Sequence, residues 1–142
     1  MTEPQQQEVT KGDGYAVANL SDLGEGPGFR KIRKSLGVTA FGANAIVLPP
    51  SYETGSHYHD EQEELYFLHS GRVAIEFGDG SSHKLEPGGL AWVDASTVRK
   101  LRNLSDSEDA TYLVVGGKDG YVGRDGQLPE GETRAGGSGA AH

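Results

Sequence analysis

The sequence Gly55-Ser-His57-Tyr-His59-Asp-Glu-Gln-Glu-Glu64-Leu-Tyr-Phe-Leu-His-Ser-Gly71 contains two histidines in alternate positions, followed by a glutamate. Side chains alternate between the two faces of an extended segment, so His57 and His59 point the same way. The next strand brings Glu64 back toward them. Two imidazoles and one carboxylate match the set that binds a first-row metal ion and leaves coordination positions open. The stretch therefore predicts His57, His59 and Glu64 as metal ligands.

The composition limits the classes of function. A chain of 142 residues with 22 glycines and 6 prolines predicts one domain with many turns and short strands. Its 13 basic and 21 acidic residues give a net charge of −8, which disfavours nucleic acid and anionic membranes as partners. The absence of cysteine excludes disulfides and thiolate zinc sites and fits a reducing compartment. With no leader and no apolar run of roughly 20 residues, we interpret the chain as cytoplasmic.

Short strand-like runs recur along the middle of the chain, separated mostly by turn-forming residues. They are residues 29–34, 40–48, 64–69, 72–77, 90–93, 97–102 and 111–115. Such a series predicts an all-β sandwich or barrel.

Alternation along residues 64–69 assigns the faces of one strand. It places Tyr66 and Leu68 on the face of Glu64, and Leu65 and Phe67 on the opposite face. Residues 111–115 are also apolar on both faces. A second sheet or a second subunit could cover the outer face, and a homodimer is the simplest prediction.

The two ends differ from the middle in composition. We expect a flexible N-terminal segment over residues 1–13, a β-barrel domain over 14–116 and a Gly-rich C-terminal segment over 117–142. Asp119-Gly120 and Asp125-Gly126 predict tight turns, so a short hairpin is expected before a flexible tail.

The stretch that ends at Gly71 resembles the first motif of the cupin family, Gly-x5-His-x-His-x(3 or 4)-Glu-x6-Gly. His57, His59, Glu64 and Gly71 match it in order, whereas Gly55 lies closer to His57 than the motif has it. The resemblance covers roughly residues 28–116. It implies a jelly-roll β-barrel, also called a double-stranded β-helix.

The second cupin motif, Gly-x5-Pro-x-Gly-x2-His-x3-Asn, is degenerate in this chain. It runs from Gly88 to Asn103, and Arg99 stands where the family has the histidine that supplies a fourth ligand. Cupins include dioxygenases, decarboxylases, isomerases and non-catalytic proteins, so the fold alone does not select a function.

Arg99 decides between two interpretations. A guanidinium and a divalent ion about 5 Å apart repel by roughly 6 to 7 kcal/mol at an effective dielectric constant near 20. In the first interpretation Arg99 turns away from the ion and binds the anionic group of a substrate, while the three ligands hold the metal. In the second, Arg99 pairs with Glu64 and its guanidinium replaces the metal as the neutralising cation.

The leading hypothesis is a single-domain cupin that binds one divalent transition metal (Mn, Fe, Co, Ni, Cu or Zn) and acts on or binds a small anionic organic molecule. Oxygenase, isomerase and decarboxylase activities stay open. Tyr66, on the face of Glu64, is the candidate catalytic residue. The alternative is a metal-free cupin that serves as a ligand-binding or scaffold protein.

The choice of Glu64 over its neighbour depends on the register of the strand. A register shifted by one residue would make Glu63 the ligand, although the family spacing to Gly71 favours Glu64.

Overall fold

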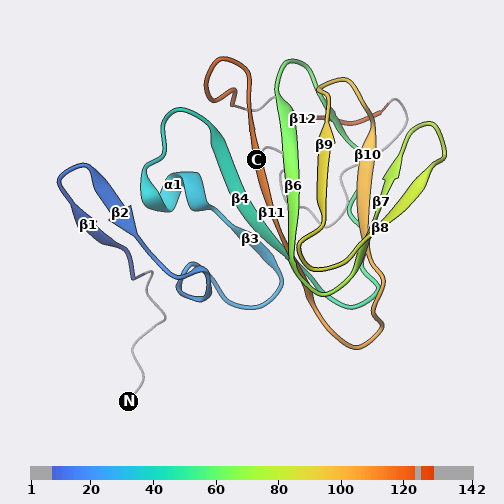
Figure 1. Ribbon diagram of the computed structural model, residues 1–142, viewed down its shortest axis with the longest axis horizontal. Helices are drawn as coiled ribbons and strands as arrows, with labels where there is room; N and C mark the ends of the chain where they lie inside the picture. Colours follow the sequence, from blue (N-terminus) through green and yellow to red (C-terminus); the bar gives the residue numbers. More distant parts are fainter. Residues whose placement is uncertain (1–7, 124–125, 130–142) are drawn as a thin grey trace.

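The computed structural model describes residues 8–123 and 126–129, and nearly all of its regular elements are β-strands (Figure 1). The strands are β1 Thr10–Gly12, β2 Tyr15–Val17, β3 Gly28–Arg30, β4 Gly42–Leu48, β5 Tyr58–His59, β6 Glu63–Ser70, β7 Val73–Phe77, β8 Ser82–Leu85, β9 Leu90–Val93, β10 Arg99–Asn103, β11 Ala110–Gly117 and β12 Gly126–Gln127. The helices are the 3-10 helix η1 Leu20–Asp22 and α1 Ile32–Leu36. Within this part of the chain no helix is long and apolar enough to span a membrane.

Two antiparallel sheets form the barrel. One has five strands in the order β3-β4-β11-β6-β9, and the other has three in the order β10-β7-β8. Strand β5, which pairs with β12, lies beside β10 because His57 forms a backbone bridge with Arg99. The all-β barrel predicted from the sequence is confirmed.

Strand β6 shows how the sequence pattern builds the core. Tyr66 and Leu68 point inward and are buried, whereas Leu65 and Phe67 on the other face are exposed. The predicted alternation is therefore confirmed. The register places Glu64 inside the barrel. Glu63 lies outside, where its carboxylate accepts a hydrogen bond from the Trp92 indole at 2.6 Å.

Six of the seven predicted runs coincide with β4, β6, β7, β9, β10 and β11, with ends that shift by at most two residues. The prediction of one strand over residues 29–34 is wrong beyond Arg30, because α1 follows immediately. Ile32 and Leu36 are one helical turn apart, and Gly37 ends the helix with a positive φ of 79°. Little in the sequence indicated this helix, because it contains only one such apolar pair and the neighbouring residues are basic.

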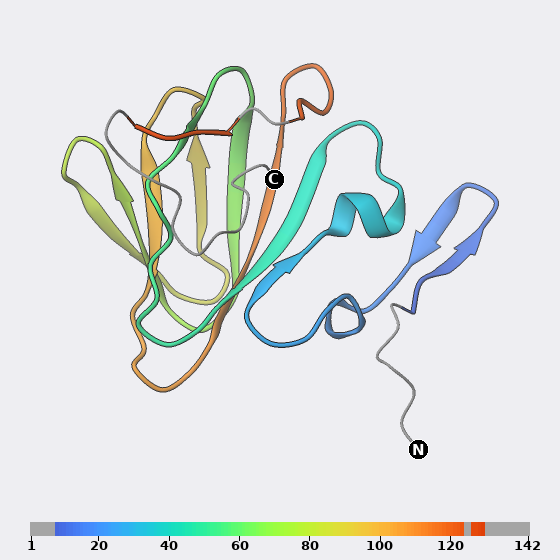
Figure 2. The same ribbon diagram turned by 180° about the vertical axis from the view of Figure 1, so that it is seen from behind.

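The ends of the chain contain elements that the sequence did not indicate. Strands β1 and β2 form a hairpin that projects beyond α1, away from the barrel, in both views (Figures 1 and 2).

Near the C-terminal end, Lys118 donates a backbone hydrogen bond of 2.8 Å to the Gly120 carbonyl, which closes the predicted turn there. Asp125 lies outside the described residues, as does the predicted tail from residue 130 onward. Gly126–Gln127 pairs with β5 rather than with residues 117–120. The domain boundaries stay predictions.

Gly71 connects β6 to β7 at a point where two constraints meet. Its φ is +83°, a value that side chains disfavour, and a Cβ atom built there would lie 2.8 Å from the Ala110 Cα at the start of β11. Gly80, in the turn between β7 and β8, has a φ of +91° but open space around it. Comparing the two glycines therefore distinguishes the cost of a positive φ, which both share, from the cost of close packing, which only Gly71 would incur.

We predict that Gly80→Ala lowers the free energy of unfolding by about 1 kcal/mol, through strain alone. Gly71→Ala adds the displacement of packed backbone and should cost about 3 kcal/mol in total. Urea unfolding followed by circular dichroism measures both values. Equal losses would show that the approach of Gly71 to β11 carries no energetic weight.

Candidate metal centre

Strand pairing brings the three predicted ligands together from separate segments. The backbone of His57 forms two hydrogen bonds with Arg99 on β10, of 3.0 and 2.9 Å. His59 lies in β5, where its N–H donates to the Ala95 carbonyl at 2.7 Å. Glu64 enters from β6 in the opposite sheet. The side chains converge in the space between the two sheets.

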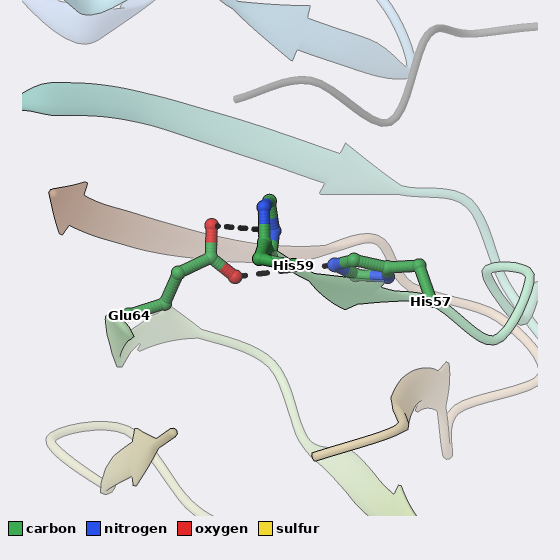
Figure 3. Close-up of side chains that lie close together, drawn as sticks. All are labelled: His57, His59 and Glu64. Atoms are coloured by element: carbon green, nitrogen blue, oxygen red, sulfur yellow. Dashed lines mark ion pairs between the residues drawn. The ribbon is translucent and has the colours of Figure 1, made fainter. Parts of the chain in front are cut away.

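The geometry of the cluster fits a shared ion. His59 Nε2 lies 3.3 Å from one oxygen of Glu64, Oε2, and His57 Nε2 lies 3.9 Å from the other, Oε1 (Figure 3). The ligand atoms of the three residues all lie within 4.8 Å of one another, and all three residues are buried. Two donors that are each about 2.1 Å from one ion lie roughly 3 to 4 Å apart. The donor types and the two nitrogen–oxygen distances thus fit a divalent transition metal.

The protonation of His57 suits a metal ligand. Burial lowers the pKa of its imidazole below the ordinary value, and the Arg99 cation lowers it further, while the nearby Glu64 carboxylate acts in the opposite direction. The net shift is downward. His57 is therefore neutral near pH 7, which is the form that coordinates metals.

Arg99 is fully buried and each of its nitrogens donates to a protein oxygen. Nη2 donates to Glu64 Oε1 at 2.8 Å, and Nε donates to the Tyr66 hydroxyl at 3.3 Å. Nη1 faces three carbonyls of the loop that precedes β10, those of residues 94, 95 and 97, at 3.2, 3.2 and 2.7 Å. The direct pair with Glu64, one of the two arrangements expected from the sequence, is the one observed. The role of Arg99 in substrate binding stays a prediction.

Tyr66 completes the surroundings of the carboxylate. Its hydroxyl donates to Glu64 Oε1 at 2.7 Å. Burial, and then the charge of Glu64, raise the pKa of the phenol well above its ordinary value. Tyr66 therefore remains a neutral hydrogen-bond donor near pH 7. Its catalytic role stays a prediction.

The two oxygens of Glu64 face different neighbours. Oε1 accepts from Arg99 and Tyr66, whereas Oε2 faces His59 Nε2 and lies 3.5 Å from the amide nitrogen of Gln62. Arg99 and a metal ion therefore need not compete for the same oxygen. The carboxylate between them also screens their repulsion.

Gln62 is a buried member of the site that the sequence analysis missed. It is 1% exposed, and its amide nitrogen lies 3.2 Å from His59 Nδ1. The signal available in the sequence is its position two residues before Glu64, which places it on the same face of an extended segment. The acidic residues around it pointed instead to a solvated loop.

A surface hollow of about 280 Å³ lies where β6 begins and β11 ends. Its lining includes Phe41, Glu63, Glu64 and Trp92, together with residues 116–120. On its inner side Gly116 pairs with Glu64, and a Cβ atom there would lie 3.0 Å from Glu64 Cγ. The hollow is a candidate approach to the carboxylate, because Glu64 is part of its lining.

Comparison with known proteins identifies the fold. The cupin domain description matches residues 45–116. Among solved structures the chain is similar to a sugar phosphate isomerase of the cupin superfamily from Silicibacter pomeroyi, with 29% identity and a TM-score of 0.58, over 63% of this chain and 58% of that one. It is also similar to a DMSP lyase from Ruegeria pomeroyi, with 22% identity and a TM-score of 0.56, over 66% and 46% of the two chains.

A third similar structure is a conserved protein with a double-stranded β-helix domain from Klebsiella pneumoniae, with 22% identity and a TM-score of 0.56, over 64% of this chain and 76% of that one. No curated protein matches the sequence. The chain spans less than two thirds of the isomerase and of the lyase. Similarity to structures at 22% identity is evidence for the fold and not for the function. The predicted jelly-roll barrel is confirmed.

We predict that Arg99→Ala lowers the free energy of unfolding by about 3 to 5 kcal/mol, because it leaves a buried carboxylate uncompensated. Arg102 on the same strand is a matched control, since it pairs with Glu76 at 3.2 Å on the partly exposed side of the sheet. Arg102→Ala should cost about 0 to 1 kcal/mol. Urea unfolding of both variants tests this. Similar small losses would mean that the Arg99–Glu64 pair does not compensate a buried charge.

Proposed function

This chain belongs to the cupin domain family, and we propose that it binds one divalent transition-metal ion through His57, His59 and Glu64. The observation that carries the proposal is the convergence of these three buried donors within one small volume. Manganese, iron, cobalt, nickel, copper and zinc all accept such ligands. An ion of this kind supplies Lewis acidity that polarises a carbonyl or enolate oxygen, or binds dioxygen if it is iron.

The charges of the site favour a small anionic organic molecule as the ligand or substrate. Glu64 and Arg99 carry opposite charges and sum to zero, and an imidazole that coordinates a metal is neutral and adds none. A divalent ion would therefore bring an uncompensated charge of about +2 into a buried site, which an anion would offset. A sugar phosphate is such an anion, and the Silicibacter pomeroyi relative is a sugar phosphate isomerase. Isomerisation, decarboxylation and oxygenation are all compatible with this chemistry.

Arg99 and Tyr66 have a common part in this proposal. Both donate to Glu64 Oε1, and together they hold the carboxylate so that Oε2 faces His59. A direct contact between Arg99 and an anion would require one of its nitrogens to leave a protein oxygen. Arg99 therefore acts on the anion through the total charge of the site, in which it offsets Glu64 so that the charge of the ion is left uncompensated. Tyr66 is the nearest hydroxyl that could orient a bound ligand or donate a proton to it.

A second candidate function rests on the 2.8 Å pair between Arg99 and Glu64. In this alternative the guanidinium is the only cation that the carboxylate needs, and the barrel is metal-free. The protein then serves as a ligand-binding or scaffold cupin. The presence or absence of a tightly bound metal separates the two candidates.

We predict that tag-free wild-type protein retains about one metal ion per chain and that His57→Ala retains none. His83→Ala is the control, because His83 is an exposed histidine on β8 and is not one of the three clustered residues. Elemental analysis after dialysis, before and after reconstitution with each of the six ions, gives the stoichiometry. Retention by His57→Ala would overturn the ligand assignment. No metal in wild type after reconstitution would favour the metal-free alternative.

A homodimer is proposed from the outer face of the five-stranded sheet. Leu65 pairs with Trp92 and Phe67 pairs with Leu90 across β6 and β9, so the four side chains form one continuous apolar patch. Leu90 and Trp92 are 61% and 62% exposed. Patches of this kind mark association surfaces, and a second copy of the chain supplies a matching apolar face.

We predict that Leu65→Lys raises the dissociation constant of the dimer at least about tenfold, because it places a charge in the patch. Ser82→Lys on β8 adds the same charge to the other sheet and should leave the constant unchanged. Sedimentation velocity over a concentration series measures it. A monomeric wild type, or a dimer that both variants weaken equally, would contradict the proposed interface.

A further inference from the structure

Gln62 lies between His59, a proposed metal ligand, and the Glu64 carboxylate. Its position allows it to determine which ring nitrogen of His59 carries the hydrogen. Its amide nitrogen is 3.2 Å from His59 Nδ1 and 3.5 Å from Glu64 Oε2. An amide nitrogen only donates hydrogen bonds. His59 Nδ1 therefore accepts from Gln62, and a nitrogen that accepts carries no hydrogen.

The other side of the His59 ring agrees with this assignment. When Nδ1 carries no hydrogen, the single hydrogen of a neutral imidazole sits on Nε2. Nε2 lies 3.3 Å from Glu64 Oε2, which is an acceptor. The Nε2–H tautomer lets Nδ1 accept from Gln62 and turns the Nε2–H dipole toward the carboxylate, whereas the Nδ1–H tautomer sets two donors against each other at Nδ1 and a lone pair against the carboxylate at Nε2.

A metal ion at the proposed centre requires the opposite tautomer. Coordination through His59 Nε2 uses the lone pair that the hydrogen now occupies, so the hydrogen must leave Nε2 and one must be added at Nδ1. Exchange with water accomplishes this with no net change in bound protons. Nδ1 then becomes a donor and needs an acceptor where the Gln62 nitrogen lies.

We propose that Gln62 is a positioning residue that sets the tautomer of His59, and that its amide reverses when metal binds. With nitrogen toward Nδ1 it holds the Nε2–H form, in which the Nε2–H faces the Glu64 carboxylate at 3.3 Å. With oxygen toward Nδ1 it holds the Nδ1–H form, which presents Nε2 to the ion. This inference rests on the proposed metal function. Glutamine is suited to the task because its amide offers a donor and an acceptor of nearly the same shape.

The test is nuclear magnetic resonance of protein labelled with 15N at histidine, which reports the hydrogen on each ring nitrogen. In the metal-free wild type we expect His59 as the Nε2–H tautomer, and after zinc is added we expect Nδ1–H. Gln62→Met removes both amide contacts and should give a mixture of tautomers without metal. The zinc affinity of this variant, measured by calorimetry, should fall about 10- to 100-fold.

Gln127→Met is the matched control. Gln127 also donates through its amide, to Asp60 at 2.8 Å, but on the exposed surface. It should leave the tautomer and the zinc affinity unchanged. An Nδ1–H form in the metal-free wild type, or an Nε2–H form in Gln62→Met as pure as in wild type, would overturn the role of Gln62. If zinc does not bind at all, the metal function fails, and the metal-free spectra still decide what Gln62 does.

Discussion

The charge pair between Arg99 and Glu64 is the constraint on which the interior of this barrel depends. An ionised carboxylate is expensive to bury, and its cost is offset only when a cation and further donors surround it. Glu64 comes from the five-stranded sheet, and Arg99 comes from the edge strand of the three-stranded sheet. The pair therefore joins the two sheets across the core. It also fixes the loop before β10, because the other end of the guanidinium binds three carbonyls of that loop.

The same pair explains how a cationic side chain coexists with a possible metal-binding cluster. A carboxylate has two oxygens, and here Arg99 and Tyr66 take one while the other faces His59. A bare arginine beside two imidazoles would repel an ion from the site. With Glu64 between them, the arginine instead orients the carboxylate that the ion would use. Arg99 is thus better understood as part of the support of the cluster than as an obstacle to it.

The features that depend on strand alternation could be predicted from the sequence. A single-turn helix and the backbone contacts of a loop could not. Alternation along β6 placed Glu64, Tyr66 and Leu68 inside correctly, because each side chain of a strand has only two directions to choose from. The helix α1 was missed because a single helical turn leaves too few residues to show its period. The carbonyls that bind Arg99 were also unpredictable. Their directions depend on backbone angles of a loop, which residue types do not specify.

The replacement of a neutral histidine by Arg99, at the position where the second cupin motif has its fourth ligand, changes the electrostatics of the site more than its shape. A site with neutral imidazoles, one carboxylate and a divalent ion carries about +1, and an arginine beside it raises the sum to about +2. Arg99 does not supply a ligand in place of that histidine, because a guanidinium only donates hydrogen bonds. A more positive site favours a charged, oxygen-donating molecule over water. For the proposed metal centre, the degenerate motif therefore changes the charge of the site, and with it the kind of molecule that the site favours.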